Sequence, residues 1–312
     1  MASLFFTQVF LRFIFKKEDS MSQSKAKKQI KKFGIFGLVP LSVFLAVLVY
    51  PFAQGFFLTF TDWNGFKFTK VIGLGNFSQS LQDAKFWVTL GFTLKFVLVS
   101  VILVNVVAFG LALLVTAKLK SSNIFRTFFF IPNLIGGVVL GVIWQFIFNT
   151  ALVSISEKFH VPFFSDSWLQ DTNKAFWALI IVTVWQSSGY MMIIYITGLI
   201  SIEQDVIEAA KVDGASPFRT LMSIKIPLMA QAFTISLFLT MRGGFMAYDV
   251  NLALTGGGPY RTTELISMHI FQEAFAFGHF GTGQAKAVLM FFMVAFAALV
   301  QVAVSKRMEV QQ

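Results

Sequence analysis

Long apolar runs constrain this chain more than any other feature of its sequence. Each is long enough to cross the roughly 30 Å hydrocarbon core of a bilayer as an α-helix. Arg242 and Gly243-Gly244 interrupt the outer end of the fifth run. Only 13% of all residues in the chain are charged. Soluble domains have about 25%. The chain is therefore predicted to be an all-α membrane protein with six spans, at about 33–60, 86–117, 124–148, 175–199, 226–248 and 285–304.

The distribution of Lys and Arg predicts the orientation of these spans. With a cytoplasmic N-terminus, basic residues are about twice as frequent in the inner segments as in the outer ones, as the positive-inside rule requires. Both termini and the segment 201–225 are then predicted to be cytoplasmic. The net charge of +10 is explained by attraction to anionic lipid of the inner leaflet, and no feature calls for nucleic acid.

The spans divide the chain into an N-terminal segment 1–32, a six-helix domain 33–304 and a cytoplasmic tail 305–312. Residues 1–20 form a Phe-rich run that is too short to span and lacks the features of a signal peptide. Two interpretations remain open for this run. It is an amphipathic helix on the membrane interface, or translation begins at Met21 and the run is not native.

The segment from Ser201 to Met229 is the longest polar-rich stretch between two apolar runs. Its first half carries apolar residues at helical spacing with charged residues between them, which predicts a short amphipathic helix. Gly214 is expected to end this helix, because glycine adopts the left-handed conformation at little cost. Ser216 and Pro217 favour the start of a second helix. The segment is therefore predicted to form a helix, a tight turn and a second helix.

Such a helical pair has apolar surface to bury but is too short to span the membrane. It can dock into a groove of another protein, or it can lie on the membrane surface. The apolar and charged pattern by itself leaves both interpretations open.

The spacing within this segment resembles the EAA loop of the permease subunits of bacterial ABC importers. Glu208-Ala209-Ala210 is followed after three residues by Gly214, and after nine more by Ile224-Lys225-Ile226-Pro227. The family usually has leucine at position 226, and isoleucine conserves its volume. The resemblance implies that the segment docks on an ATPase, with these residues in coupling: Glu208, Ala209, Ala210, Asp213, Gly214, Ile224 and Pro227.

Further motifs resemble the maltose and glycerol-phosphate type of sugar permease. They include Phe60-Thr61-Asp62-Trp63 at the end of the first span and Thr255-Gly256-Gly257-Gly258-Pro259 in the last external loop, which is similar to the maltose-type F subunit. The resemblance implies a carbohydrate importer of the bacterial inner membrane. Its expected partners are a second homologous permease, two copies of an ABC ATPase, an extracytoplasmic sugar-binding protein, membrane lipid and a carbohydrate, most simply an oligosaccharide.

No catalytic arrangement or metal cluster is found in the sequence. There is no Cys, the three His are dispersed, and the GxxxxGK[ST] phosphate loop is absent. We therefore expect no enzyme activity and no cofactor in this chain, with ATP and magnesium bound by the partner ATPase. The alternative, an ion-gradient-driven secondary transporter, would need ionisable residues buried within the spans.

Polar residues within the spans are the candidates for contact with substrate, although each is also a candidate for a hydrogen bond between helices. The cluster from Gln186 to Tyr190 is the densest, and Asn105 lies deeper in the second span. Matched to the maltose-type motifs, the resemblance implies that sugar contacts Asn133, Gly137, Ser187, Tyr190, Gly244, Ala247 and Tyr248.

Lys95 is a basic residue within the second predicted span, roughly 12–13 Å from its start. It can extend toward the outer interface, or it can line the substrate path and favour an acidic sugar. The sequence does not decide between a neutral and an acidic sugar.

Overall fold

The computed structural model describes residues 33–117 and 122–306. The chain divides into two compact units, of which the first ends at Phe57 and the second begins at Leu58. The predicted N-terminal segment 1–32 and most of the tail 305–312 lie outside the described residues. Both interpretations of residues 1–20 therefore stay open.

The first described helix is the predicted first span, and it covers Phe36–Leu58 as a run of 23 residues. Two π-helical turns interrupt its α-helical hydrogen bonding without ending it. The successive pieces are η1 (Gly34–Leu38), α3 (Val39–Phe44), η2 (Leu45–Val49) and α4 (Tyr50–Leu58).

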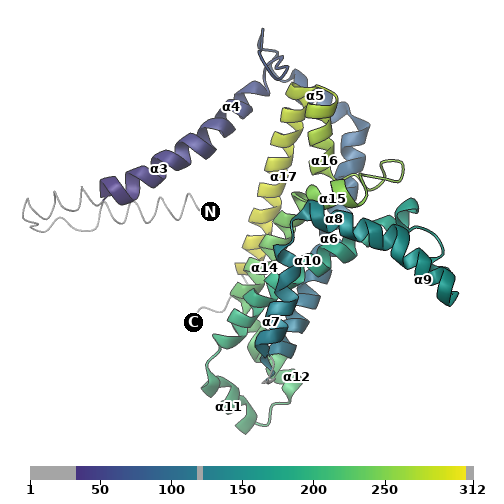
Figure 1. Cartoon of the computed structure of the whole chain (residues 1–312). Coiled ribbons are helices and arrows are strands. Elements are labelled where there is room, and N and C mark those ends of the chain that lie inside the picture. The colour runs from purple at the N-terminus through teal and green to yellow at the C-terminus, as the bar shows by residue number, and fades with distance from the viewer. Residues whose placement is uncertain (1–32, 118–121, 307–312) are drawn as a thin grey trace, which may run out of the picture. The chain divides into compact units, whose positions relative to one another are not determined.

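Four long helices run beside one another in the second unit (Figure 1). The side chain of Asp83 caps α6 by accepting from the Lys85 amide at 2.9 Å, and Asp171 caps α10 by accepting from the Lys174 amide at 2.8 Å. A capping carboxylate satisfies free amides and suits the positive end of a helix. The four helices are α6 (Ala84–Thr116), α10 (Thr172–Ile200), α14 (Ala230–Phe245) and α17 (Phe280–Lys306).

The third predicted span is wrong in its bounds. The run 124–148 is not one helix, because Pro132 lacks a backbone donor and Gly136 is extended, with φ −60° and ψ 140°. The helix that starts at Gly137 continues to Phe159 and is the candidate span. Its pieces lie across the bundle in Figure 1. The elements in order are α7 (Ser122–Phe130), η3 (Ile131–Leu134), α8 (Gly137–Phe146), η4 (Ile147–Ala151) and α9 (Leu152–Phe159).

The fifth predicted span is bent near its start. α14 continues through Arg242 and Gly243-Gly244 to Phe245, so these residues do not interrupt the helix. The helices before and after Met229 are instead bent by 70°, just after Pro227. Among the described residues, five helices are long and apolar enough to span, or six if this bent pair is one span.

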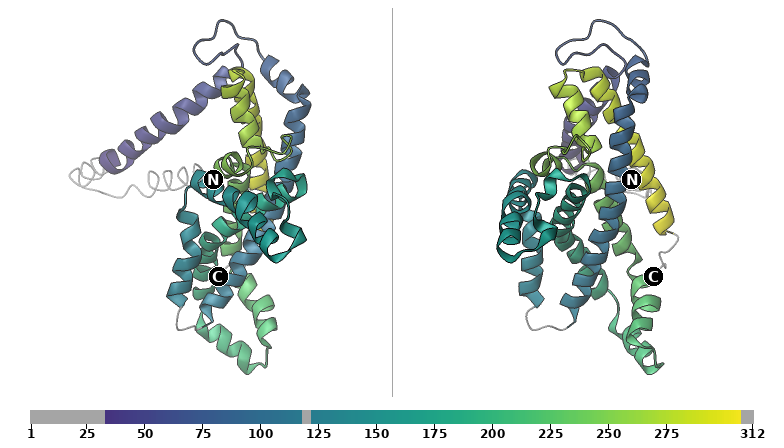
Figure 2. Two further views of the ribbon diagram at one scale, coloured as in Figure 1. Left: turned by 45° about the vertical axis from the view of Figure 1, so that its right-hand side comes forward. Right: turned by 90° about the vertical axis from the view of Figure 1, so that its right-hand side faces the viewer.

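Short elements cap the two ends of the second unit, and they stay at opposite ends in every view (Figure 2). One end carries a loop closed by an isolated bridge between Thr61 and Val71, then α5 (Gly75–Gln82), α16 (Ile266–Phe271) and η8 (Gln272–Ala276). The other end carries α11 (Gln204–Val212), α12 (Pro217–Thr220), η7 (Leu221–Lys225) and α13 (Ile226–Leu228). The remaining short helices are η5 (Pro162–Phe164), η6 (Trp168–Gln170) and α15 (Asp249–Leu254).

Asn105 joins three of the long helices in the middle of the bundle. Its side-chain oxygen accepts hydrogen bonds from Tyr195 and Ser236, each at 2.6 Å, and its nitrogen donates to Thr240 at 3.1 Å. Tyr195 is fully buried. These contacts favour the interhelical role for Asn105, because its side chain is already satisfied without a ligand.

Candidate functional site

A cavity of about 380 Å³ lies where the broken third run meets α6, α10 and α14. Its wall combines hydroxyl and amide groups with small and apolar side chains. The lining residues are Ser100, Val104, Asn133, Gly137, Thr183, Gln186, Ser187, Met191, Leu239, Thr240, Gly243, Gly244, Met246, Ala247, Tyr248, Asp249 and Val250.

Neighbouring residues stabilise the break in the third run. Gln186 donates a hydrogen bond of 3.1 Å to the carbonyl of Ile135, which the break leaves outside a regular helix. Irregular backbone at membrane depth needs such a partner. On the other side of the break, a Cβ added to Gly137 would lie 2.7 Å from the Cβ of Asp249. Glycine is therefore needed for α8 to approach the start of α15 this closely.

Six of the seven predicted sugar-contact residues line this cavity: Asn133, Gly137, Ser187, Gly244, Ala247 and Tyr248. Tyr190 does not, and its side chain is 40% exposed on the chain surface. The prediction missed Thr183 and Met191, four residues before and after Ser187 on the same helix face. That spacing was a usable signal, because residues four apart share one side of a helix. It also missed Asp249, the neighbour of Tyr248.

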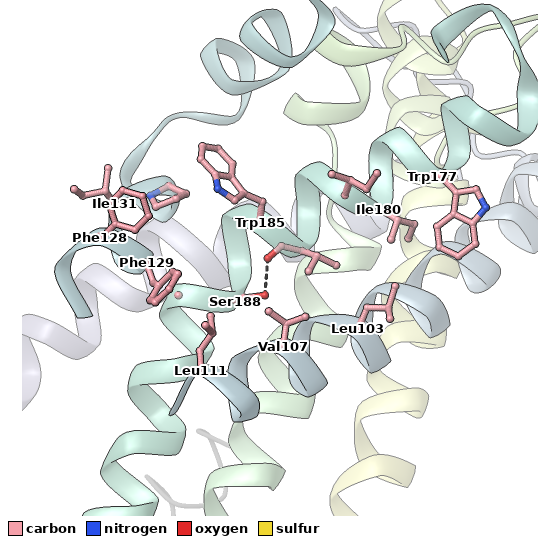
Figure 3. A pocket seen from close by; sticks show the side chains of 14 residues that line it. Leu103, Val107, Leu111, Phe128, Phe129, Ile131, Trp177, Ile180, Trp185 and Ser188 are labelled. Carbon is pink, nitrogen blue, oxygen red and sulfur yellow. Dashed lines mark hydrogen bonds between the residues drawn. The ribbon is translucent and has the colours of Figure 1, made fainter. Parts of the chain in front are cut away.

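A second, larger cavity of about 570 Å³ lies between α6, α7 and α10 and is lined almost entirely by apolar side chains (Figure 3). Ser188 is its polar residue, and its hydroxyl already donates to the carbonyl of Val184 at 2.6 Å. A sugar would find few hydrogen-bond partners here. The helices meet closely beside it, since a Cβ on Gly189 would lie 1.8 Å from the carbonyl oxygen of Phe129.

A buried network of charged side chains joins α6, α16 and α17 at the end of the unit opposite α11. Lys286 is 1% exposed, and its ammonium contacts Asp83 at 2.6 Å, Glu273 at 2.9 Å and His269 at 3.1 Å. Lys286 is the second residue of the predicted sixth span 285–304. The structure places it in the second turn of α17, where three partners offset its loss of hydration.

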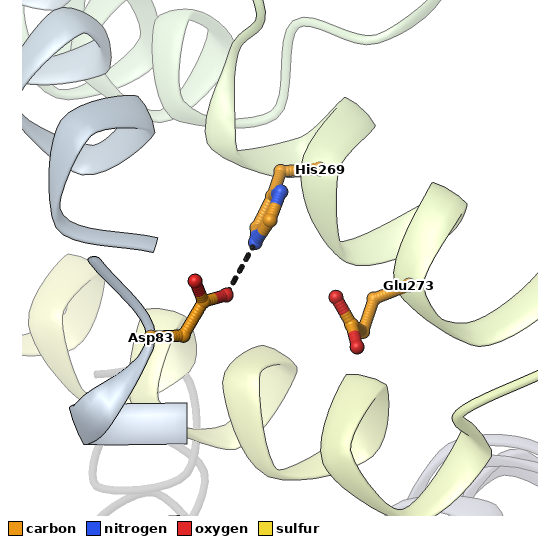
Figure 4. A group of neighbouring side chains, drawn as sticks. All are labelled: Asp83, His269 and Glu273. Carbon is orange, nitrogen blue, oxygen red and sulfur yellow. Dashed lines mark ion pairs between the residues drawn. The ribbon is translucent and has the colours of Figure 1, made fainter. Parts of the chain in front are cut away.

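Asp83, His269 and Glu273 offer ligand atoms within 4.8 Å of one another, as in a metal site (Figure 4). The ammonium of Lys286 lies within hydrogen-bond distance of all three residues. It thus supplies the positive charge that an ion would bring. The geometry favours a charge-paired structural cluster over a metal centre.

Glu264 anchors the other half of this network. Its carboxylate contacts Arg261 at 2.7 Å, His269 at 3.2 Å and Lys85 at 3.3 Å. Burial alone would raise the pKa of Glu264, but hydrogen bonds from His269 and Arg261 outweigh it and lower that pKa to about 2. Burial likewise opposes the ionised forms of Asp83 and Glu273, yet hydrogen bonds from Lys286 lower the pKa of both.

The predicted helix, turn and helix between 201 and 229 are confirmed. α11 is followed by Gly214 with φ +75°, and the Ser216 hydroxyl accepts from the Arg219 amide at 3.3 Å ahead of Pro217. Glu208, Ala209 and Asp213 are exposed, whereas Ala210 is buried. Large apolar side chains at this tip face outward, Val212 being 87% and Phe218 69% exposed. The tip therefore presents both apolar and acidic groups to a partner.

Comparison with known proteins identifies the family. Residues 105–310 match the model of the binding-protein-dependent transport system inner membrane component. The chain is 45% identical over 271 residues to a probable starch degradation products transport system permease protein of Thermoanaerobacterium thermosulfurigenes, covering 87% of this chain and 92% of that protein. It is 30% identical over 276 residues to a multiple sugar-binding transport system permease protein of Streptococcus mutans, covering 88% and 95%.

The fold is also that of a solved importer. One chain of a bacterial ABC transporter involved in the import of the acidic polysaccharide alginate superposes with a TM-score of 0.77 at 19% identity, covering 91% of this chain and 99% of that one. At this identity the likeness concerns the fold alone. Together with the match over 105–310, it confirms the all-α permease architecture. The chain belongs to the inner membrane components of binding-protein-dependent transport systems, the permease subunits of ABC importers.

Proposed function

We propose that this chain forms part of the path along which an ATP-driven importer moves an oligosaccharide across the inner membrane. The observation that carries the proposal is the small polar cavity, where six positions matched to sugar-permease motifs converge from separate segments. Sugars present hydroxyl edges and apolar C–H faces, which suit a wall of hydroxyl, amide and aliphatic groups. The printed names of relatives that transport starch degradation products or multiple sugars support the same substrate class.

Permeases of this family are not catalytic and bind no cofactor, and a separate subunit hydrolyses ATP. Family membership therefore favours ATP hydrolysis over the ion-gradient alternative as the source of energy. We propose that a second homologous permease completes the path, that two ATPase copies bind ATP and magnesium, and that an external binding protein delivers the sugar.

The coupling residues keep their predicted role in this proposal. Glu208 and Asp213 are exposed at the tip of the unit, beside the exposed side chains of Val212 and Phe218. A rigid pair of short helices can transmit movement of an ATPase to the bent helices 217–245. We propose that the tip and both termini lie on the cytoplasmic side, as the distribution of Lys and Arg predicts, and that the charge network lies on the outer side.

Uptake by the purified importer in liposomes, with ATP inside and the binding protein outside, tests the sugar path. Ser187→Phe fills the cavity, so we expect uptake of maltotriose to fall more than about tenfold while the ATPase subunits stay bound. Thr197→Phe is the matched control, because Thr197 is exposed on the same helix. Normal uptake by the Ser187 variant would contradict the proposed path.

The coupling role has a separate test in the same liposomes. Gly214→Val strains a backbone position with φ +75°, and Glu208→Ala removes an exposed charge. Both changes should reduce sugar uptake per ATP hydrolysed in complexes that still assemble. Unchanged coupling in both variants would show that this tip does not act as the lever.

A further inference from the structure

The wall of the small cavity carries a charge that the motif comparison did not indicate. Among the described residues that line it, Asp249 is the one Asp, Glu, Lys, Arg or His. Its polar neighbours in the wall are uncharged: Ser100, Asn133, Thr183, Gln186, Ser187, Thr240 and Tyr248. The part of the cavity wall contributed by this chain therefore has one acidic side chain and no basic one.

The carboxylate of Asp249 lies beside the first residue of α8. Its Oδ2 lies 3.5 Å from where a Cβ of Gly137 would be, next to the N-terminal end of the ten-residue helix α8. The positive end of a helix favours an ionised carboxylate. Within the described part of the chain, no hydrogen bond or ion pair engages this side chain, which is exposed. Its oxygens are therefore available to accept hydrogen bonds.

The basic residues closest in sequence to the cavity wall are not part of it. The ammonium of Lys95 lies 4.5 Å from the ring centroid of Phe176, and Lys95 is not part of the wall. Arg242 is not part of it either, although Gly243 and Gly244 are. Of the two interpretations of Lys95, this geometry supports the one in which it does not attract an acidic sugar to this site.

We propose that Asp249 makes the site selective for uncharged sugars. Its carboxylate accepts hydrogen bonds from sugar hydroxyls, and it repels a sugar that carries a carboxylate or sulfate. Two like charges roughly 6 Å apart at an effective dielectric constant of about 20 disfavour binding by roughly a hundredfold, and salt reduces this toward tenfold. The inference rests on the proposed sugar path and adds the class of sugar to it.

The test measures binding to the assembled permease pair with its ATPase subunits in lipid nanodiscs. The external binding protein is left out, so that its own selectivity does not enter. The probes are maltotriose and maltotriose oxidised at its C6 hydroxyls to carboxylates. By calorimetry, the wild-type complex should bind the neutral sugar at least about tenfold more tightly, because the oxidised sugar adds negative charges beside Asp249.

Three variants separate the charge from other effects. Asp249→Asn should reduce the preference for the neutral sugar over the oxidised one to within about threefold. Asp249→Glu keeps the charge and should keep the wild-type preference. Asp166→Asn makes the same chemical change on an exposed loop and should leave the preference unchanged. The proposal would be overturned if Asp249→Asn kept the wild-type preference for the neutral sugar, or if the wild type bound both sugars equally.

A second measurement reports the effect of Asp249 on the electrostatic potential inside the small cavity, and it needs no sugar. This chain has no Cys, so Thr183→Cys introduces its single thiol into the cavity wall. The ratio of its labelling rates with a cationic and an anionic methanethiosulfonate should fall several-fold when Asp249 is changed to Asn. An unchanged ratio overturns the electrostatic inference. If the ratio falls but the wild type binds neither sugar, the proposed sugar path fails, and the selectivity fails with it.

Discussion

Replacing Lys286 by Met tests whether the buried charge network stabilises the end of the unit opposite α11. The substitution keeps the unbranched chain as far as Cε and removes one ammonium, which contacts Asp83, Glu273 and His269 at 2.6, 2.9 and 3.1 Å. Removing one partner of a buried ion pair costs about 3–5 kcal/mol, because the remaining charge is left uncompensated. The Asp83 side chain is 29% exposed and can regain water, so we expect about 3 kcal/mol.

This loss should lower the melting temperature of the purified complex by roughly 6–12 °C, measured at about pH 7.5 by tryptophan fluorescence. Lys95→Met is the matched control. Lys95 is exposed, and its ammonium contacts the Phe176 ring. An exposed contact of this kind is worth about 0.5–1 kcal/mol. The control should therefore melt within a few degrees of the wild type.

The pH dependence distinguishes lost charge pairing from lost packing. In the wild type, Lys286 lowers the pKa of Asp83 and Glu273, so their stabilisation is present above the ordinary carboxyl pKa and is lost as the pH falls. In Lys286→Met these carboxyls take up protons at a higher pH. The difference in melting temperature between variant and wild type should therefore shrink as the pH falls toward about 4. The same difference at both pH values, or one no larger than that of Lys95→Met, would refute this reasoning.

Two further outcomes follow from the same contacts. Gly189→Ala forces a Cβ to within 1.8 Å of the Phe129 carbonyl, so we expect a loss near the upper end of the 1–3 kcal/mol that overpacking typically costs. Gly110→Ala has open space and should be neutral or stabilising; equal melting of the two variants would contradict the contact. Acid should destabilise the wild type between about pH 4.5 and 2. The ionised Glu264 carboxylate stabilises the fold, as its lowered pKa indicates, and this stabilisation is lost when Glu264 is protonated. Glu264→Gln should show a shallower slope there, and an equal slope would assign the acid transition to other groups.

Local features of this protein could be predicted well from the sequence. Run length and charge determined the all-α membrane class, and the spacing of Glu208, Gly214 and Pro227 determined the helical tip and the family resemblance. Gly214 and Ser216 adopt the turn and cap roles that their chemistry favours. These features depend on neighbours within a few residues, which the sequence shows directly.

The faces of the membrane helices could not be predicted in the same way. Lipid and protein neighbours both accept apolar side chains, so the apolar runs have little periodicity that separates a lining face from an outer one. Only the packing decided that Ser187 lines the cavity while Tyr190, three residues later, does not. The break after Pro132 also depends on a distant partner, because Gln186, 51 residues from Ile135, donates a hydrogen bond to the Ile135 carbonyl.

The sequence by itself determined which chemical groups this permease has and, except for the third span, roughly where the spans begin and end. The tertiary structure decided which groups meet. Lys286 contacts Asp83, 203 residues away in sequence, and Asp249 packs against Gly137 at the start of α8. The physical reason is that ion pairs and close glycine contacts form between distant segments. Their strength depends on burial, which no local pattern within an apolar run records.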